Sequence, residues 1–224
     1  MLWWKAWMET RWRLAFLVAC CGLLWAEGIV FGVPLVKLRA AFVVQYAAVW
    51  GLAATMLAGA GLNSQTTWGT AAGYHGSMLF TLSLPVARRK LFAVRALAGA
   101  AETCALIVVS AVPLVRFAGL GWSAASLFIA GALVCSMTAY AISALFACVT
   151  GEMWQLYGSW GVLILLSVSL RFPLLARFNP LRGCLLSAYT ATAQFPWRDA
   201  WLGSAFLATL CCVAAVRILD HKEY

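Results

Sequence analysis

Residues 122–149 read WSAASLFIAGALVCSMTAYAISALFACV and contain no charged side chain. An α-helix rises about 1.5 Å per residue, so this stretch is long enough to cross the roughly 30 Å hydrocarbon core of a lipid bilayer. Backbone amides and carbonyls find no water in that core, and a helix satisfies them internally. The stretch therefore predicts a membrane-spanning helix.

The whole chain has the composition of an integral membrane protein. Of its 224 residues, 64% are hydrophobic and 10% are charged, whereas a soluble domain has roughly 45–50% apolar and about 25% charged residues. The net charge of +9 predicts contact with anionic lipid rather than nucleic acid, because the cations stand at the ends of apolar segments. The cysteines form no CxxC or Cys–His cluster, so we expect small buried side chains rather than metal ligands.

Six apolar segments are long enough to cross a bilayer. They cover residues 14–35, 41–62, 91–115, 122–149, 154–170 and 200–219. Together they predict an all-α membrane protein with one transmembrane domain over residues 1–224. No clear internal repeat is present, which argues against an inverted-repeat transporter.

An even number of spans places both termini on the same side of the membrane. On this topology, that side collects nine cations and the other side seven. Because positively charged residues favour the cytoplasmic side, we expect both termini in the cytoplasm.

The first thirteen residues, MLWWKAWMETRWR, differ from the spans. Lys5, Glu9 and Arg13 recur every fourth position and would form one polar stripe on a helix. This pattern predicts a short amphipathic helix on the membrane surface, with indole rings at headgroup depth. The anchoring indoles are those of Trp3, Trp4, Trp7 and Trp12.

Two long connections separate the spans. Residues 63–90, on the expected cytoplasmic side, begin polar and glycine-rich and continue as MLFTLSLPVARRK, which can form a short amphipathic helix ending near Pro85. Residues 171–199, on the opposite side, contain three prolines and apolar pieces too short to cross. We expect short re-entrant helices there.

Motifs for chemistry are missing from the sequence. There is no GxxxxGK[ST] phosphate loop, no HExxH and no GxSxG, and the chain holds two histidines. We therefore expect no catalytic residue, no metal site and no ATP binding by this chain.

Counted at about 1.5 Å per residue from the predicted helix starts, Glu27 and Glu102 each lie more than halfway through the roughly 30 Å hydrocarbon core. A carboxylate at that depth costs a few kcal/mol or more and normally faces other helices or water. Each residue is therefore either an interhelical clamp or a polar point on a translocation path. Gly51, Thr55 and Gly59 recur every fourth position in the second span and predict close helix packing, within one subunit or between two.

Residues 76–102, GSMLFTLSLPVARRKLFAVRALAGAAE, resemble the segment of type-2 ATP-binding cassette exporter permeases that commonly reads GT…TLSLPVSR before a membrane span. The layout is also similar: a surface helix, six spans, FNPL at residues 178–181 and a last span ending AAVRILD. One departure is the sequence Gly73-Tyr74-His75-Gly76, where family members often carry acidic and basic residues.

The resemblance implies a cytoplasmic coupling helix that docks in a groove of a separate ATP-binding subunit, which holds ATP and magnesium. Apolar residues would form the docking plug, and the cations after it would hold the segment at the headgroup layer. The plug residues are Leu79, Phe80, Leu82, Leu84 and Pro85, and the cations are Arg88, Arg89 and Lys90.

The family likeness also implies a second permease copy, identical or a paralogue. Such a complex would export a hydrophobic or amphipathic substrate, such as a lipid, peptide or drug, across the bacterial inner membrane. The alternative is a stand-alone channel or proton-coupled carrier that uses Glu27 and Glu102.

Overall fold

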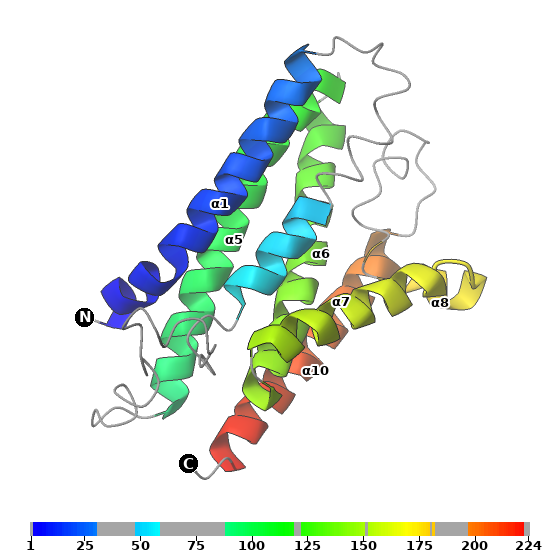
Figure 1. The fold of residues 1–224 in the computed structure, drawn as a ribbon. Coiled ribbons are helices and arrows are strands. Elements are labelled where there is room, and N and C mark those ends of the chain that lie inside the picture. The colour runs from blue at the N-terminus through cyan, green and yellow to red at the C-terminus, as the bar shows by residue number, and fades with distance from the viewer. Residues whose placement is uncertain are drawn as a thin grey trace.

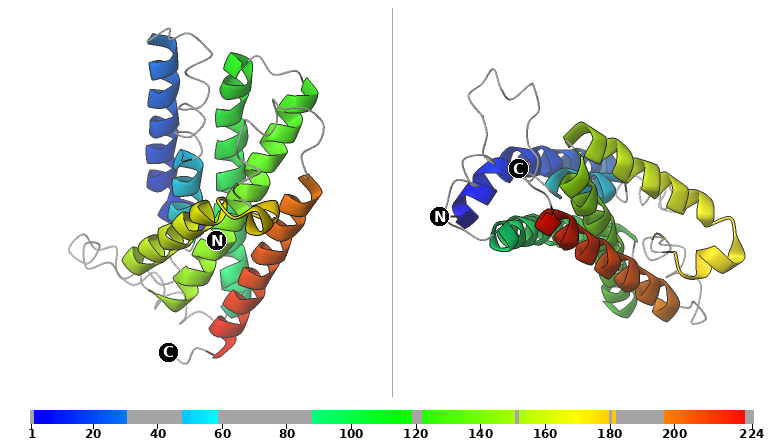
Figure 2. Two further views of the ribbon diagram at one scale, coloured as in Figure 1. Left: turned by 90° about the vertical axis from the view of Figure 1, so that its right-hand side faces the viewer. Right: turned by 90° about the horizontal axis from the view of Figure 1, so that it is seen from below.

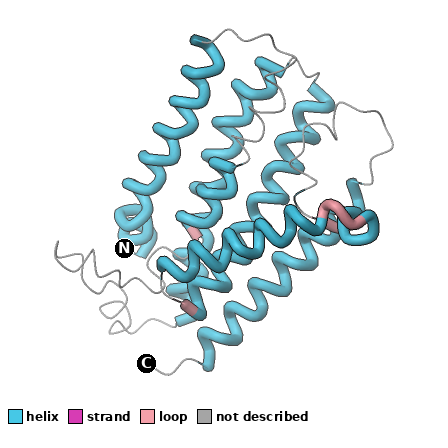
Figure 3. Tube along the Cα trace, turned by 45° about the vertical axis from the view of Figure 1, so that its right-hand side comes forward, coloured by secondary structure: helices cyan, strands magenta, loops and turns pink. Residues whose placement is uncertain are grey.

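The computed structural model describes residues 2–30, 48–58, 88–118, 122–150, 152–179, 181 and 197–221. Within these ranges all regular structure is helical and no strand is present (Figure 3). The helices are α1 (Leu2–Val30), α5 (Arg88–Ala118), α6 (Trp122–Val149), α7 (Glu152–Ser169), α8 (Pro173–Arg177) and α10 (Trp197–His221). A further short apolar helix spans Ala48–Leu57.

Three helices of the described chain are long and apolar enough to cross a membrane. The spanning windows are Phe92–Pro113 in α5, Ala125–Val149 in α6 and Asp199–Ile218 in α10. The prediction of an all-helical membrane protein is confirmed at this level. The six spans predicted from the sequence stay a prediction.

The helix boundaries agree best where the apolar runs are longest. The bounds of α6 are those predicted, and α5 and α10 contain the predicted spans 91–115 and 200–219. α5 and α6 lie side by side and run in opposite directions (Figure 1), as their short connection predicts. The second predicted span, 41–62, is described only from residue 48 to residue 58.

α7 differs from the other long helices in direction. It forms close to the predicted span 154–170, but it lies across the direction of α1, α5, α6 and α10 (Figure 2). The short helix α8 follows it and begins with Pro173, whose missing amide is unneeded at a first helical position. Whether residues 171–199 re-enter the membrane stays a prediction, because residues 182–196 lie outside the described chain.

The amino-terminal segment is not a separate helix. Residues 1–13 were predicted as an interfacial helix before a span at 14–35, but α1 is one continuous helix from Leu2 to Val30. Arg11 and Arg13 do not interrupt it, because arginine is a good helix former and no proline stands nearby. The first turns of α1 bend away from the axis of the rest (Figures 1 and 2).

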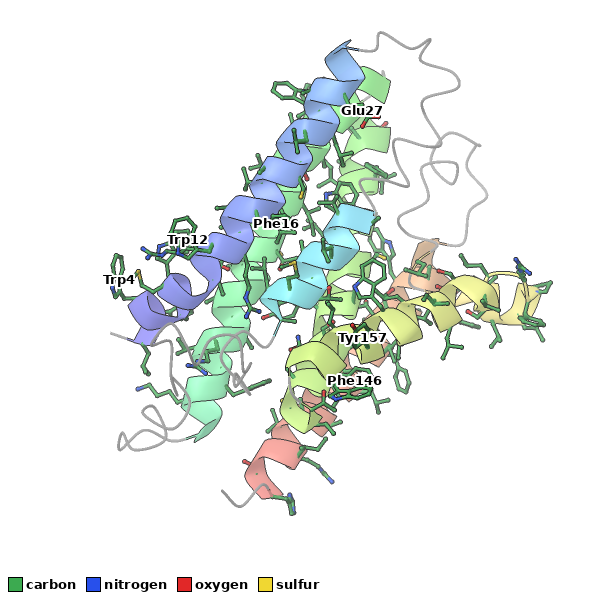
Figure 4. All side chains as sticks on the ribbon, viewed as in Figure 1. Trp4, Trp12, Phe16, Glu27, Phe146 and Tyr157 are labelled. Carbon is green, nitrogen blue, oxygen red and sulfur yellow. The ribbon has the colours of Figure 1, made fainter. Side chains whose placement is uncertain are left out.

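The four predicted anchoring indoles, Trp3, Trp4, Trp7 and Trp12, are exposed in the structure. Figure 4 shows Trp4 and Trp12 near the start of α1, pointing away from the other helices. This exposure fits the predicted contact with the headgroup layer, which stays a prediction.

The core lies where the Ala48–Leu57 helix meets its neighbours. Leu17 of α1, Leu57, Leu106 of α5 and Tyr140 of α6 belong to one buried cluster. Trp50 is fully buried, donates through Nε1 to Ser110 Oγ at 2.8 Å, and stacks at a tilt 6.0 Å from the ring of Phe128. The short helix is therefore fixed against α1, α5 and α6.

Candidate functional site

A chain of polar contacts connects four elements around the carboxyl end of the Ala48–Leu57 helix. Thr10 and Arg13 belong to α1, Glu102 to α5 and Gln155 to α7. All four side chains are directed toward neighbouring helices, as their hydrogen bonds show. These four residues form the polar cluster. Its hydrogen bonds connect α1 with α5, and the Ala48–Leu57 helix with α1 and α7.

Glu102 contacts α1 through Thr10. The hydroxyl oxygen of Thr10 lies 2.6 Å from Glu102 Oε1 and 3.2 Å from the carbonyl oxygen of Ala6. The single hydroxyl proton allows two arrangements. Thr10 donates to an ionised Glu102, or a protonated Glu102 donates to Thr10, which then donates to Ala6. The contact can therefore persist in either protonation state of the carboxyl group.

The second oxygen of Glu102 is different. Glu102 Oε2 is buried and has no hydrogen-bond partner among the described residues. The contact with Thr10 is the geometry expected of an interhelical clamp, one of the two interpretations open from the sequence. The other, a point on a translocation path, is untested and stays a prediction.

Arg13 and Gln155 both donate to the end of the Ala48–Leu57 helix. Arg13 Nη1 donates to the carbonyl oxygen of Met56 at 2.9 Å. Gln155 Nε2 donates to the carbonyl oxygen of Thr55 at 3.1 Å and also to that of Ala58. The last carbonyls of a helix have no partner within it, so these side chains supply donors that the helix itself lacks.

α5 approaches the same helix end through a glycine. A Cβ atom added at Gly99 would lie 2.7 Å from the carbonyl oxygen of Leu57 and 2.6 Å from the hydroxyl of Tyr140. Tyr140 in turn donates to the carbonyl oxygen of Ala96 at 2.8 Å. Only glycine allows this approach of α5, α6 and the short helix.

Glu27 is separate from the polar cluster. Its side chain is exposed and lies toward the far end of α1 (Figure 4). Seventeen residues separate it from Thr10, which corresponds to about 25 Å along a helix. A translocation path that uses both carboxylates of one copy would require Glu27 and Glu102 to lie close together. The structure does not bring them together.

The FNPL sequence at 178–181 has a structural role at the end of α7. Asn179 is buried, and its Nδ2 donates to the carbonyl oxygen of Leu166 at 2.6 Å and to Ser169 Oγ at 2.7 Å. Its Oδ1 accepts from the backbone amide of Leu181 at 2.8 Å. Asn179 thus joins the last turn of α7 to the chain that follows α8.

The predicted docking plug, residues 79–85, lies outside the described residues. Arg88 and Arg89 are the first two residues of α5, and the side chain of Lys90 is exposed. The cations therefore stand directly before the spanning window that begins at Phe92.

The predicted stripe of small residues is divided. Thr55 is buried, Gly59 lies outside the described chain, and a Cβ atom at Gly51 would meet nothing within 4 Å. Close approach occurs instead at other glycines, among them Gly99, which no pattern in the sequence predicted. A lone amide in an apolar segment was the signal that could have pointed to Gln155.

No group of three His, Cys, Asp or Glu residues that could hold a metal ion occurs within the described ranges. Comparison of the chain with protein families, with curated proteins and with solved structures finds no match.

Proposed function

We propose that this chain is the membrane subunit of an ATP-driven exporter of the type-2 ATP-binding cassette class. Two permease copies, identical or paralogous, work with two separate ATPase subunits. ATP binding draws the ATPase subunits together, and the coupling helices transmit that movement to the spans. A hydrophobic or amphipathic substrate then leaves across the bacterial inner membrane.

One observation carries the proposal: the sequence of residues 76–102, which resembles the coupling segment of these permeases and the span after it. The second half of that stretch, from Arg88 to Glu102, is helical and forms the start of α5. An exposed Lys90 followed within two residues by an apolar spanning window suits a joint between a docking helix and a moving span.

The arrangement of the helices is compatible with the rest of the proposal. The start of α1 and the end of α10 lie toward the same end of the bundle (Figure 1), as an even number of spans requires. In the proposal, this end faces the cytoplasm, the exposed indoles of α1 lie at the headgroups, and residues 171–199 form the external re-entrant region. Helix α1 and residues 41–62 supply two of the remaining spans, and α7, which lies across the other long helices here, would have to turn along them to supply the third (Figure 2).

The test is a charge placed in the docking plug. Leu82→Asp would bury an unpaired carboxylate in an apolar groove, which costs several kcal/mol. Capture of the ATPase subunit from a co-expressing membrane should fall sharply, while the chain itself stays monodisperse. The double variant Arg88→Gln/Arg89→Gln is the control, because it removes charges at the headgroups and should leave capture nearly unchanged. Undiminished capture by Leu82→Asp would contradict the proposal.

A further inference from the structure

The carboxyl end of the Ala48–Leu57 helix lies inside the bundle and not at its surface. Thr55, Leu57 and Ala58 are each 1% exposed or less. A helix end leaves up to four carbonyl groups without an internal partner, and a buried carbonyl without a donor costs roughly 1–3 kcal/mol. Donors from outside the helix therefore stabilise the end at this place.

Two side chains from different helices supply them. Arg13 of α1 donates to Met56, and Gln155 of α7, which is 5% exposed, donates to Thr55 and Ala58. The amide nitrogen of glutamine carries two hydrogens, so it can serve two carbonyls at once. The guanidinium of Arg13 also meets the partial negative charge at a helix carboxyl terminus.

We infer that Arg13 and Gln155 are positioning residues that lock the end of the Ala48–Leu57 helix to α1 and α7. This carbonyl lock, the set of hydrogen bonds from Arg13 and Gln155 to the three carbonyls, makes the three elements move as one unit. A displacement of the short helix is then passed both to the amino-terminal part of α1 and to the crossing helix α7. This consequence for transport rests on the proposed function, whereas the lock itself does not.

Hydrogen–deuterium exchange of the full chain in detergent tests the lock directly. The amides of residues 55–58 report the last turn, where Ala58 N donates to the carbonyl oxygen of Ala54 at 3.2 Å. In Arg13→Met and in Gln155→Leu, exchange of these amides should rise about ten-fold, the effect of losing one ordinary hydrogen bond. Exchange in the middle of α6 should stay unchanged, and Arg13→Lys, which keeps a donor and the charge, should restore protection.

Arg11→Met is the matched control for Arg13→Met. It removes the same charge from the same helix, but the Arg11 guanidinium lies over the Trp12 ring, 5.4 Å from its centre. Protection of residues 55–58 should be that of the wild type. If both lock variants leave it unchanged as well, the inference is wrong.

Loss of the fold is recognised by faster exchange in α6 too. In that event the milder variant Gln155→Asn is measured. Its side chain carries the same amide group but is one methylene shorter, so the amide no longer reaches the carbonyls. Faster exchange confined to residues 55–58 supports the lock, and wild-type protection there overturns it.

The consequence for transport is measured in the complex with the ATPase subunit. Arg13→Met should lower ATP turnover by the complex about ten-fold without reducing the amount of ATPase subunit bound, and Arg13→Lys should restore turnover. If ATP turnover is unchanged while exchange at residues 55–58 is faster, the lock exists but has no role in coupling. That result would overturn the inferred consequence for transport. If the wild-type chain binds no ATPase subunit, the proposed function fails, and the exchange result still decides the lock.

Discussion

Helices α6 and α10 have nearly the same apolar character but different surroundings. Their spanning windows have mean hydropathies of 2.0 and 1.8, yet 67% of the α6 window is buried within the chain and only 17% of the α10 window. Hydropathy therefore predicts that a helix can cross a membrane, but it does not predict whether lipid or other helices cover the helix. α6 is the centre of the bundle, and α10 lies at its edge.

The distribution of side chains explains the difference. α10 packs on α6 by one side, where Thr138 Oγ1 lies 3.4 Å from the carbonyl oxygen of Ser204. Its other side carries large apolar residues spaced three and four apart, which places them in one stripe along the helix. These residues, all exposed, are Leu202, Phe206, Leu210 and Val213. We expect lipid or a second copy of this chain to cover this stripe.

Replacing one phenylalanine by alanine on α6 and one on α10 should give the largest difference in the free energy of unfolding. Phe128 of α6 is 0% exposed and Phe206 of α10 is 71% exposed. Phe128→Ala leaves a cavity beside Trp50 and should lower the free energy of unfolding by about 3 kcal/mol. Phe206→Ala should change it by less than about 0.5 kcal/mol. Titration of the folded chain with SDS in mixed micelles measures both, and equal losses would refute the assignment of α6 as the centre.

A second pair of variants tests close packing at the core. Gly99→Ala places a methyl group against Leu57 and Tyr140 and should destabilise the chain by about 2 kcal/mol. Gly51→Ala meets open space within a helix and should stabilise it by about 0.5–1 kcal/mol. The same unfolding titration applies. If Gly51→Ala lowers the free energy of unfolding and Gly99→Ala does not, then the stripe of small residues predicted from the sequence is the packing surface.

The contact between α1 and α5 should have a smaller effect. Thr10→Val keeps the shape of the side chain but leaves both oxygens of Glu102 without a partner among the described residues, at a cost of about 1.5 kcal/mol. Glu102→Gln, which can still bond to Thr10, should cost less in stability. Transport that falls in Glu102→Gln while assembly is intact would favour the translocation path. Failed assembly of Glu102→Gln would favour the clamp.

Glu27 should contribute least. Because its side chain is exposed at the far end of α1, Glu27→Gln should alter stability by less than about 0.5 kcal/mol. Unfolding of the single chain measures this value. If Glu27→Gln lowers the free energy of unfolding as much as Thr10→Val does, then Glu27 is covered by other helices or by a second copy of the chain.

The comparison also shows which features a sequence can predict. The bounds of α6 follow from a long uncharged run between Gly121 and Gly151. The continuity of α1 was missed because the polar stripe of Lys5, Glu9 and Arg13 suggested a change of environment, and a change of environment does not break hydrogen bonds along a helix. Charge patterns predict depth in a membrane better than they predict helix ends.

The polar cluster was only partly predictable. Glu102 was identified because an acid in an apolar span is costly wherever it lies. Its partner Thr10, and the carbonyls that Arg13 and Gln155 contact, depend on how helices distant in sequence pack. Backbone carbonyls carry no sequence signature, so side chains that bind them cannot be paired with their acceptors before the fold is known.

The central claim is that this chain works with a separate ATPase. Its most direct test is native mass spectrometry of the chain co-expressed with a candidate ATP-binding cassette subunit, with ATP turnover measured on the same sample. The proposal predicts two permease chains with two ATPase chains, turnover by the complex and none by the purified permease. A permease that purifies alone, or that hydrolyses ATP by itself, would contradict it.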